Sequence, residues 1–149
     1  MRKKILLLLT MTVLALTLVG CAAAFDGAKD LQKDPFETAT EYKTRLEKYG
    51  FQTIGEITLV DSNYDIATST FNLQIKLENW VATTLSPTAE YKLKIDPKKA
   101  KSLYDKTTSY PLQGKFSANG EKPTVTELQV TSGFSKYKIE LPSGANIAK

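Results

Sequence analysis

Apolar and polar residues alternate over several stretches of the chain after Gly50, and a period of two residues predicts strands with one buried face. The alternating or β-rich stretches are 52–60, 71–77, 91–95, 112–118, 124–131 and 136–141. Asn119-Gly120 separates two of them and is a strong signal for a tight turn between paired strands. These segments therefore predict six strands.

Residues 39–49 follow a helical period instead. Thr38 and Glu41 have the spacing of a capping box, and Gly50 supplies a stop signal. Glu41 and Arg45 lie one turn apart, so we expect them to form an ion pair on the helix surface. The apolar stripe consists of Ala39, Tyr42, Leu46 and Tyr49.

A second, short helix is predicted over 97–104, because Asp96-Pro97 resembles an N-cap followed by proline at the first helical position. The resulting order is α-β-β-β-α-β-β-β. Strands linked by turns pair antiparallel, and one amphipathic helix covers one face of a sheet. We expect an α+β fold, with a twisted, mainly antiparallel sheet of five to six strands and the N-terminal helix on its concave side.

The first 20 residues have the pattern of an export signal. Arg2-Lys3-Lys4 precedes the apolar run 5–19, which is shorter than the roughly 20 residues of a membrane-spanning helix. Leu18-Val19-Gly20-Cys21 resembles the bacterial lipobox. That resemblance implies cleavage before Cys21 and attachment of a diacylglycerol to its sulfur. The alternatives are an ordinary secretory signal with a chance cysteine, or an uncleaved anchor.

The lipid anchor implies a place in the cell envelope. Ala22-Ala23 carries no acidic residue directly after Cys21, and an aspartate there resembles an inner-membrane retention signal in Gram-negative lipoproteins. The prediction is therefore the outer membrane in a Gram-negative cell and the outer face of the plasma membrane in a Gram-positive one. Membrane lipid, bound through acylated Cys21, is the first expected partner.

Composition narrows the chemistry. The 149 residues include 20 Lys+Arg and 16 Asp+Glu, but the segment from Cys21 has 17 basic and 16 acidic residues. The basic pI therefore largely reflects the leader and does not indicate a nucleic-acid partner. The chain has no His and Cys21 is its single Cys, so the mature part lacks the usual general base and soft metal ligands. We expect no cofactor and no metal site.

The domain boundaries follow from these patterns. Residues 1–20 are the signal peptide, and 21–33, which show no period, are expected to form a flexible tether. Residues 34–142 form a single α+β domain, and 143–149 form a loose C-terminal tail. The tether is expected to bury nothing.

The start of the domain carries a second resemblance. Phe36-Glu37-Thr38-x-x-Glu41-Tyr42-x-x-Arg45-Leu46 looks like a module of uncharacterised exported bacterial proteins. A later Ile95-x-x-x-x-Ala100-x-x-Leu103 extends the likeness to about half of the mature chain. The resemblance implies no catalytic residue, and a capped helix start with an ion pair accounts for the motif.

Asp61-x-Asn63-x-Asp65 places three oxygen donors at alternate positions, as a calcium loop does. The pattern then fails, because Ile66 stands where glycine is needed and Asn72 where a bidentate carboxylate is needed. We therefore interpret the segment as a β-turn.

Three residues are candidates for binding. Lys92 and Lys94 share the polar face of one strand, within a lysine-rich stretch that runs to Lys106; this stretch is either an ordinary solvated surface or a contact for an anionic membrane or glycan. Trp80 is out of phase with the apolar face of 71–77, so either a bulge returns it to the core or it stands exposed as an anchor for a sugar ring or a protein.

No sequence motif supports catalysis, and the scattered carboxylates single out no pair. The leading hypothesis is a non-catalytic binding or scaffold domain on an envelope lipoprotein, with a protein or glycan partner. The alternatives are an inhibitor of a secreted hydrolase, acting through the turns at 61–65 or 119–122, and an envelope-polymer hydrolase that uses a carboxylate pair.

Overall fold

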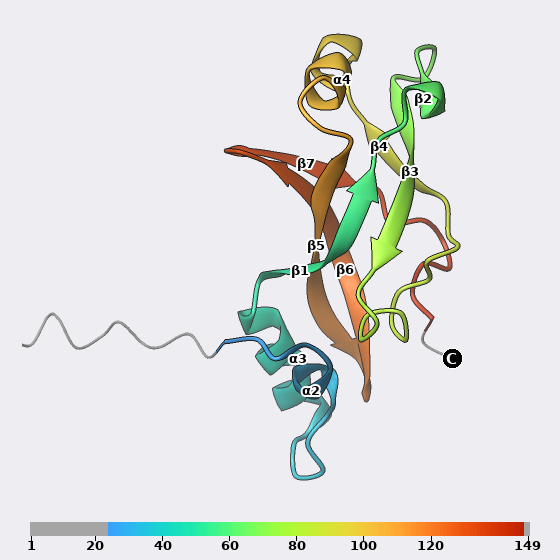
Figure 1. Cartoon of the computed structure of the whole chain (residues 1–149). Helices are drawn as coiled ribbons and strands as arrows, with labels where there is room; N and C mark the ends of the chain where they lie inside the picture. The colour runs from blue at the N-terminus through green and yellow to red at the C-terminus, as the bar shows by residue number, and fades with distance from the viewer. Residues whose placement is uncertain (1–23, 148–149) are drawn as a thin grey trace, which may run out of the picture.

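The computed structural model describes residues 24–147 and confirms an α+β fold (Figure 1). Its helices are α2 (Gly27–Leu31), α3 (Ala39–Lys48), the 3-10 helix η1 (Asp61–Asn63) and α4 (Pro97–Tyr104). Its strands are β1 (Phe51–Thr58), β2 (Tyr64–Asp65), β3 (Thr70–Leu77), β4 (Tyr91–Lys94), β5 (Ser109–Asn119), β6 (Lys122–Ser132) and β7 (Ser135–Ile139). The predicted signal peptide 1–20 and Cys21 lie outside the described residues.

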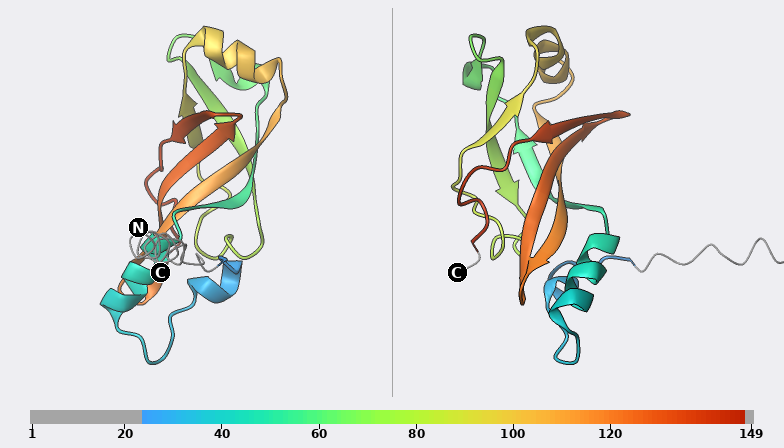
Figure 2. Two further views of the ribbon diagram at one scale, coloured as in Figure 1. Left: turned by 90° about the vertical axis from the view of Figure 1, so that its left-hand side faces the viewer. Right: turned by 180° about the vertical axis from the view of Figure 1, so that it is seen from behind.

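The strands form one curled sheet in the order β2-β3-β1-β5-β6-β7, with β4 paired to β3. Every pairing between the described strands is antiparallel, as the turn signals predict. A bridge between Lys92 and Glu140 joins β4 to the residue after β7, so the sheet curls until its two ends meet (Figure 2). The described residues contain one strand more than the six predicted, namely β2. It has two residues and is too short to show an alternating pattern in the sequence.

Burial follows the predicted alternation. On β4, Tyr91 and Leu93 are buried between exposed Lys92 and Lys94, and β5 buries its alternate residues from Tyr110 to Phe116. Gly55 lies at the β-bulge in β1, where a side chain would collide with the backbone oxygen of Lys76. All buried apolar side chains of the described residues belong to one core cluster.

α3 begins at the predicted capping box. The Thr38 hydroxyl accepts from the Glu41 amide, and the Glu41 carboxylate accepts from the Thr38 amide at 2.8 Å. Tyr42 and Leu46 are fully buried, and α3 contacts β5 at one end of the sheet (Figure 1). The helix therefore starts where the sequence predicts and joins the common core. 

The predicted ion pair between Glu41 and Arg45 is not formed. The Glu41 carboxylate is occupied by Thr38, whereas Arg45 Nε lies 2.9 Å from Oε1 of Glu37. Capping takes precedence because the carboxylate satisfies the Thr38 amide, which has no partner within the helix.

The flexible tether predicted for 21–33 is wrong for its described part. Residues 27–31 form α2, and Leu31 is buried in the core. The Tyr42 hydroxyl donates to the Leu31 carbonyl, and Arg45 donates to the carbonyls of Asp30 and Gln32. Two side chains of α3 therefore fix the backbone of this segment by hydrogen bonds. Because such bonds do not depend on apolar residues within the segment, no hydrophobic period marks it in the sequence.

The predicted loose tail is also wrong over 143–147. Ala145 is buried, and the Asn146 side chain both donates to the carbonyl and accepts from the amide of Val125. The Ile147 amide donates to the Thr84 carbonyl. The tail thus connects β6 to the turns that follow β3 by hydrogen bonds to both. 

Within residues 24–147, no helix combines the length and the apolar character that crossing a membrane requires.

Candidate functional site

A hollow with a volume of about 720 Å³ lies where α2 and the loop after it meet the turns following β3 and β5. We call it the Trp80 hollow. Its apolar lining consists of Ala28, Leu31, Pro35, Trp80 and Pro123, and its polar lining of Gln32, Lys33, Asp34, Thr83, Thr84 and Glu121. An aromatic wall with several polar groups is the usual composition of a small-ligand site.

Trp80 is half-buried, and a turn rather than a bulge positions it. β3 ends at Leu77, and the Val81 amide then donates to the Glu78 carbonyl, which takes Trp80 out of the alternation. Its ring lies 5.5 Å from that of Phe25 and 5.9 Å from that of Phe116, measured between centroids. One part of the indole therefore belongs to an aromatic cluster, while another part lines the hollow.

Charged groups on the rim are already partly engaged. Lys33 Nζ lies 3.5 Å from Oε1 of Glu121, with the lysine side chain 18% exposed and the glutamate side chain 80% exposed. Asp34 Oδ1 accepts from the Phe36 amide at 2.8 Å. The ion pair is exposed on one side and weak in water, so a ligand with hydroxyl groups can exchange for it at low cost.

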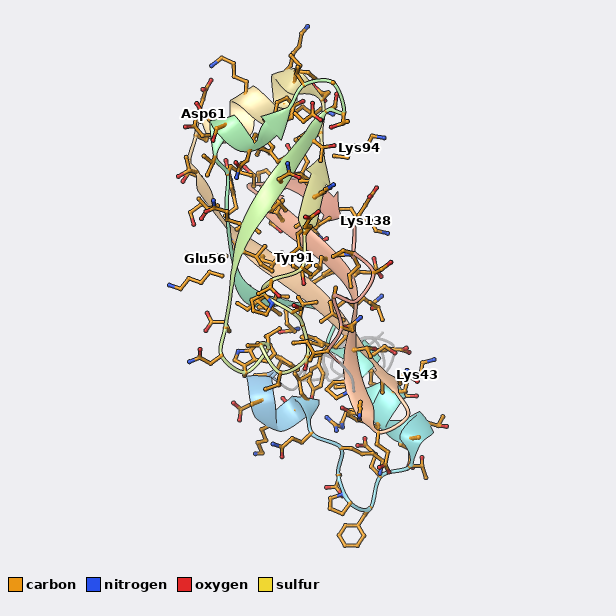
Figure 3. All side chains as sticks on the ribbon, turned by 90° about the vertical axis from the view of Figure 1, so that its right-hand side faces the viewer. Lys43, Glu56, Asp61, Tyr91, Lys94 and Lys138 are labelled. Atoms are coloured by element: carbon orange, nitrogen blue, oxygen red, sulfur yellow. The ribbon has the colours of Figure 1, made fainter. Side chains whose placement is uncertain are left out.

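Lys92 and Lys94 lie elsewhere, on a hollow of about 220 Å³ that they share with Thr68, Thr70 and Glu140. The structure therefore separates them from Trp80, with which the sequence grouped them. β4 and β7 are in contact here, and β7 places the exposed Lys136 and Lys138 on the same side as the β4 lysines. Figure 3 shows Lys94 and Lys138 on the same side of the molecule.

We call Lys92, Lys94, Lys136 and Lys138 the basic seam. None of the four forms an ion pair among the described residues. Sequence reasoning missed the two β7 lysines because more than 40 positions separate them from β4. The sequence signal that could have found them is the alternation that both strands share. Lys92 and Lys94 flank the inward-facing Leu93 on β4, and Lys136 and Lys138 flank Tyr137 on β7 in the same way.

The segment from Asp61 to Asp65 is a 3-10 turn leading into β2 and not a simple β-turn. The Asp65 carboxylate accepts from the Ala67 amide and the Thr68 hydroxyl, and these bonds, the hydroxyl first, hold its pKa below the ordinary value. Within residues 24–147 there is no group of three or more acidic side chains placed to share a metal ion. The Asp65 carboxylate therefore stabilises the turn that follows it.

A third hollow, of about 410 Å³, lies between α4 and the β2–β3 turn. Tyr64, Phe71 and Tyr104 line it, and Ile66 stands 73% exposed beside it. Apart from Asp61, Lys101 and Asp105 on its rim, the lining offers few polar groups to orient a ligand. Lys101 and Asp105 are moreover paired with each other at 2.7 Å.

Comparison of the chain with models of protein families, with curated proteins and with solved structures found no significant match. 

Proposed function

We propose that this chain is a lipid-anchored protein of the bacterial cell envelope whose domain binds an envelope glycan in the Trp80 hollow without catalysing a reaction. The single observation that carries the ligand part of this proposal is the hollow of about 720 Å³ with Trp80 in its wall. The anchor part rests on the lipobox residues that end at Cys21.

A sugar ring matches the chemistry of this hollow. The apolar face of a pyranose stacks on an indole, and its hydroxyl groups exchange hydrogen bonds with amide, hydroxyl and carboxylate groups. Gln32, Thr83 and Glu121 supply those groups around Trp80. An envelope protein would need a larger apolar contact, and its capture is the competing outcome of the test below.

The carboxylates of the hollow support binding rather than hydrolysis. A glycosidase needs two carboxyl groups facing one bond, one of them held protonated by its surroundings. Here Asp34 accepts from its own loop, and Glu121 is largely exposed beside a lysine. Both residues are exposed to water.

The rest of the fold has supporting roles in this proposal. α3 acts as a brace that packs on the sheet through Tyr42 and Leu46, and its Glu47 accepts from the Ser117 hydroxyl of β5 at 2.8 Å. The anchor holds the domain at the outer membrane of a Gram-negative cell, or at the outer face of the plasma membrane of a Gram-positive one.

The basic seam supports a second contact with the same envelope. Lys94 and Lys138 carry like charges on neighbouring strands, and such an arrangement is relieved when an anionic polymer lies between them. Four such lysines would give an attraction that weakens steeply with salt. Lys92→Ala with Lys94→Ala should therefore reduce retention on envelope polymer at low salt and have little effect at high salt.

The anchor is tested by mass spectrometry of the N-terminal peptide from cells. The proposal predicts a peptide that begins at Cys21 and carries acyl chains, and a Cys21→Ser variant released from the membrane. An unmodified Cys21 would overturn it.

The ligand is tested by placing a photo-cross-linking amino acid at Thr83, on the rim of the hollow, in intact cells. Thr126, exposed on β6 and outside the hollow, is the matched control position. Glycan captured from position 83 and not from 126 supports the proposal. Capture of one defined protein instead, or equal capture from both positions, contradicts it.

A further inference from the structure

The described chain begins at the aromatic cluster. Phe25 packs against Tyr49 with ring centroids 4.8 Å apart, and it also lies 5.8 Å from Phe116. Only three residues separate Phe25 from Cys21. Since an extended residue spans at most about 3.6 Å, the Cα atoms of Cys21 and Phe25 lie within about 14 Å of each other. A lipid on Cys21 would hold this end of the domain at the bilayer.

The loop between α2 and α3 presents a phenylalanine at the same end of the molecule, opposite α4 and β2 (Figure 1). Phe36 is 96% exposed, although its loop is well held. Its own amide donates to Asp34, and the Glu37 amide donates to the Asp34 carbonyl at 3.0 Å. Arg45 binds the loop from both sides, through Glu37 and through the Gln32 carbonyl.

Both carboxylates beside Phe36 are held in place, and that of Glu37 is paired with a cation. The Asp34 carboxylate accepts from the Phe36 amide, and the Glu37 carboxylate is bound by the Arg45 guanidinium. A phenyl ring at the tip of a fixed loop can enter the interfacial region of a bilayer while the exposed Asp34 carboxylate stays among the hydrated headgroups and Glu37 stays paired with Arg45.

We propose that Phe36 is a membrane-insertion residue: the loop between α2 and α3 docks on the bilayer that carries the Cys21 anchor. This inference rests on the proposed lipidation, because the anchor supplies the proximity that a single phenyl ring lacks. Once the chain is attached to the bilayer through Cys21, insertion of Phe36 becomes an intramolecular step. Even a weak affinity of the phenyl ring for the bilayer then suffices to populate the inserted state. Docking also brings the Trp80 hollow, which Asp34 and Pro35 line, to the membrane surface.

The short segment between Cys21 and Phe25 favours the bilayer over a protein as the partner of this loop. A partner in solution would have to reach a loop that the anchor keeps close to the headgroups, whereas the bilayer is always within reach. Phe134 is equally exposed, and its β6–β7 turn lies away from the loop between α2 and α3 (Figure 1). It provides a matched exposed phenylalanine on a different loop.

The test uses the chain from Cys21, which retains residues 24–147 and so every contact described above. Its single cysteine is coupled to a maleimide phospholipid in phosphatidylcholine vesicles that contain brominated acyl chains. Phe36→Trp is compared with Phe134→Trp, each in a Trp80→Phe background. The proposal predicts a blue shift and loss of emission for Trp at position 36 only. No quenching at 36, or equal quenching at both positions, would overturn it.

A second readout needs no substitution. Chymotrypsin should cut the uncoupled chain after both Phe36 and Phe134, and the coupled chain after Phe134 only. Equal cleavage after Phe36 in the two samples would contradict the proposal. Because the lipid is attached chemically, these results test the docking of the loop, whereas the mass of the cellular N-terminal peptide tests the lipidation itself.

Discussion

The guanidinium of Arg45 binds the carboxylate of Glu37 through two nitrogens, with Nε 2.9 Å from Oε1 and a terminal nitrogen 3.0 Å from Oε2. The same side chain donates to the carbonyls of Asp30 and Gln32, at 2.7 and 2.8 Å. Arg45 therefore fastens α2 and the following loop to α3. This fastening explains the Phe36-to-Leu46 motif in structural terms, because Glu37, Tyr42 and Arg45 each hold part of the N-terminal segment.

Arg45→Ala should lower the free energy of unfolding by about 2 kcal/mol, since several hydrogen bonds to a charged group are lost together. Arg45→Lys should restore only part of this, because an ammonium group cannot reproduce the planar fork of a guanidinium. Chemical denaturation measures both values. Lys43→Ala, an exposed change on the same helix, is the control and should be nearly neutral. Equal effects at positions 43 and 45 would refute the role of Arg45.

Acid should weaken the same contact. The hydrogen bond from Arg45, more than any other interaction, lowers the pKa of Glu37 below its ordinary value of 4.5. A carboxyl group with a lowered pKa in the folded state stabilises the fold above 4.5, and this stabilisation disappears as the pH falls through the folded-state pKa. Glu37→Gln should therefore be less stable at neutral pH and lose less stability in acid. A variant with the full acid dependence of the parent would contradict the assignment.

Leu31→Ala should cost about 3 kcal/mol, the usual loss for a leucine truncated in a core. Leu31 is only 5% exposed, and the carbonyl of the same residue accepts from Tyr42. The matched control is Lys29→Ala, at an exposed position of α2. A midpoint of denaturation that does not move in Leu31→Ala would mean that residues 24–33 behave as a free tether.

Asn146→Ala should lower the free energy of unfolding by about 2 kcal/mol, because Val125 loses a partner for its amide and another for its carbonyl. Hydrogen exchange would then show faster opening of the Val125 amide. Ser143→Ala, exposed and a few residues earlier, should leave that amide protected. Unchanged exchange in Asn146→Ala would show that the tail does not hold β6.

The sequence predicts most of the regular elements because each carries its own period. The capping box at Thr38, the alternation around Leu93 and the turn at Asn119 are local signals, and the structure confirms all three. The curl of the sheet is not local. The bridge between Lys92 and Glu140 closes over 47 intervening residues that carry no sign of it.

The errors over the two segments predicted to be unstructured share one physical cause. Residues 24–33 and 143–147 are held by side chains that bond their backbone, or that reach from them to a distant backbone, as Tyr42 and Asn146 do. Such bonds leave no apolar period, so both segments looked unstructured. Trp80 was ambiguous for a related reason, because the turn after β3 ends the alternation on which its position was judged.

Trp80 is the only tryptophan of the chain, so its fluorescence reports directly on the hollow that the proposed binding function depends on. The decisive measurement is a titration of the chain from Cys21 with soluble peptidoglycan fragments released by a muramidase. Glycan binding in the Trp80 hollow predicts a saturable change in emission that weakens in Gln32→Ala and persists in Lys92→Ala, whose lysine lies on the other hollow. Emission that stays constant throughout, or that changes equally in parent and Gln32→Ala, would contradict glycan binding in the Trp80 hollow.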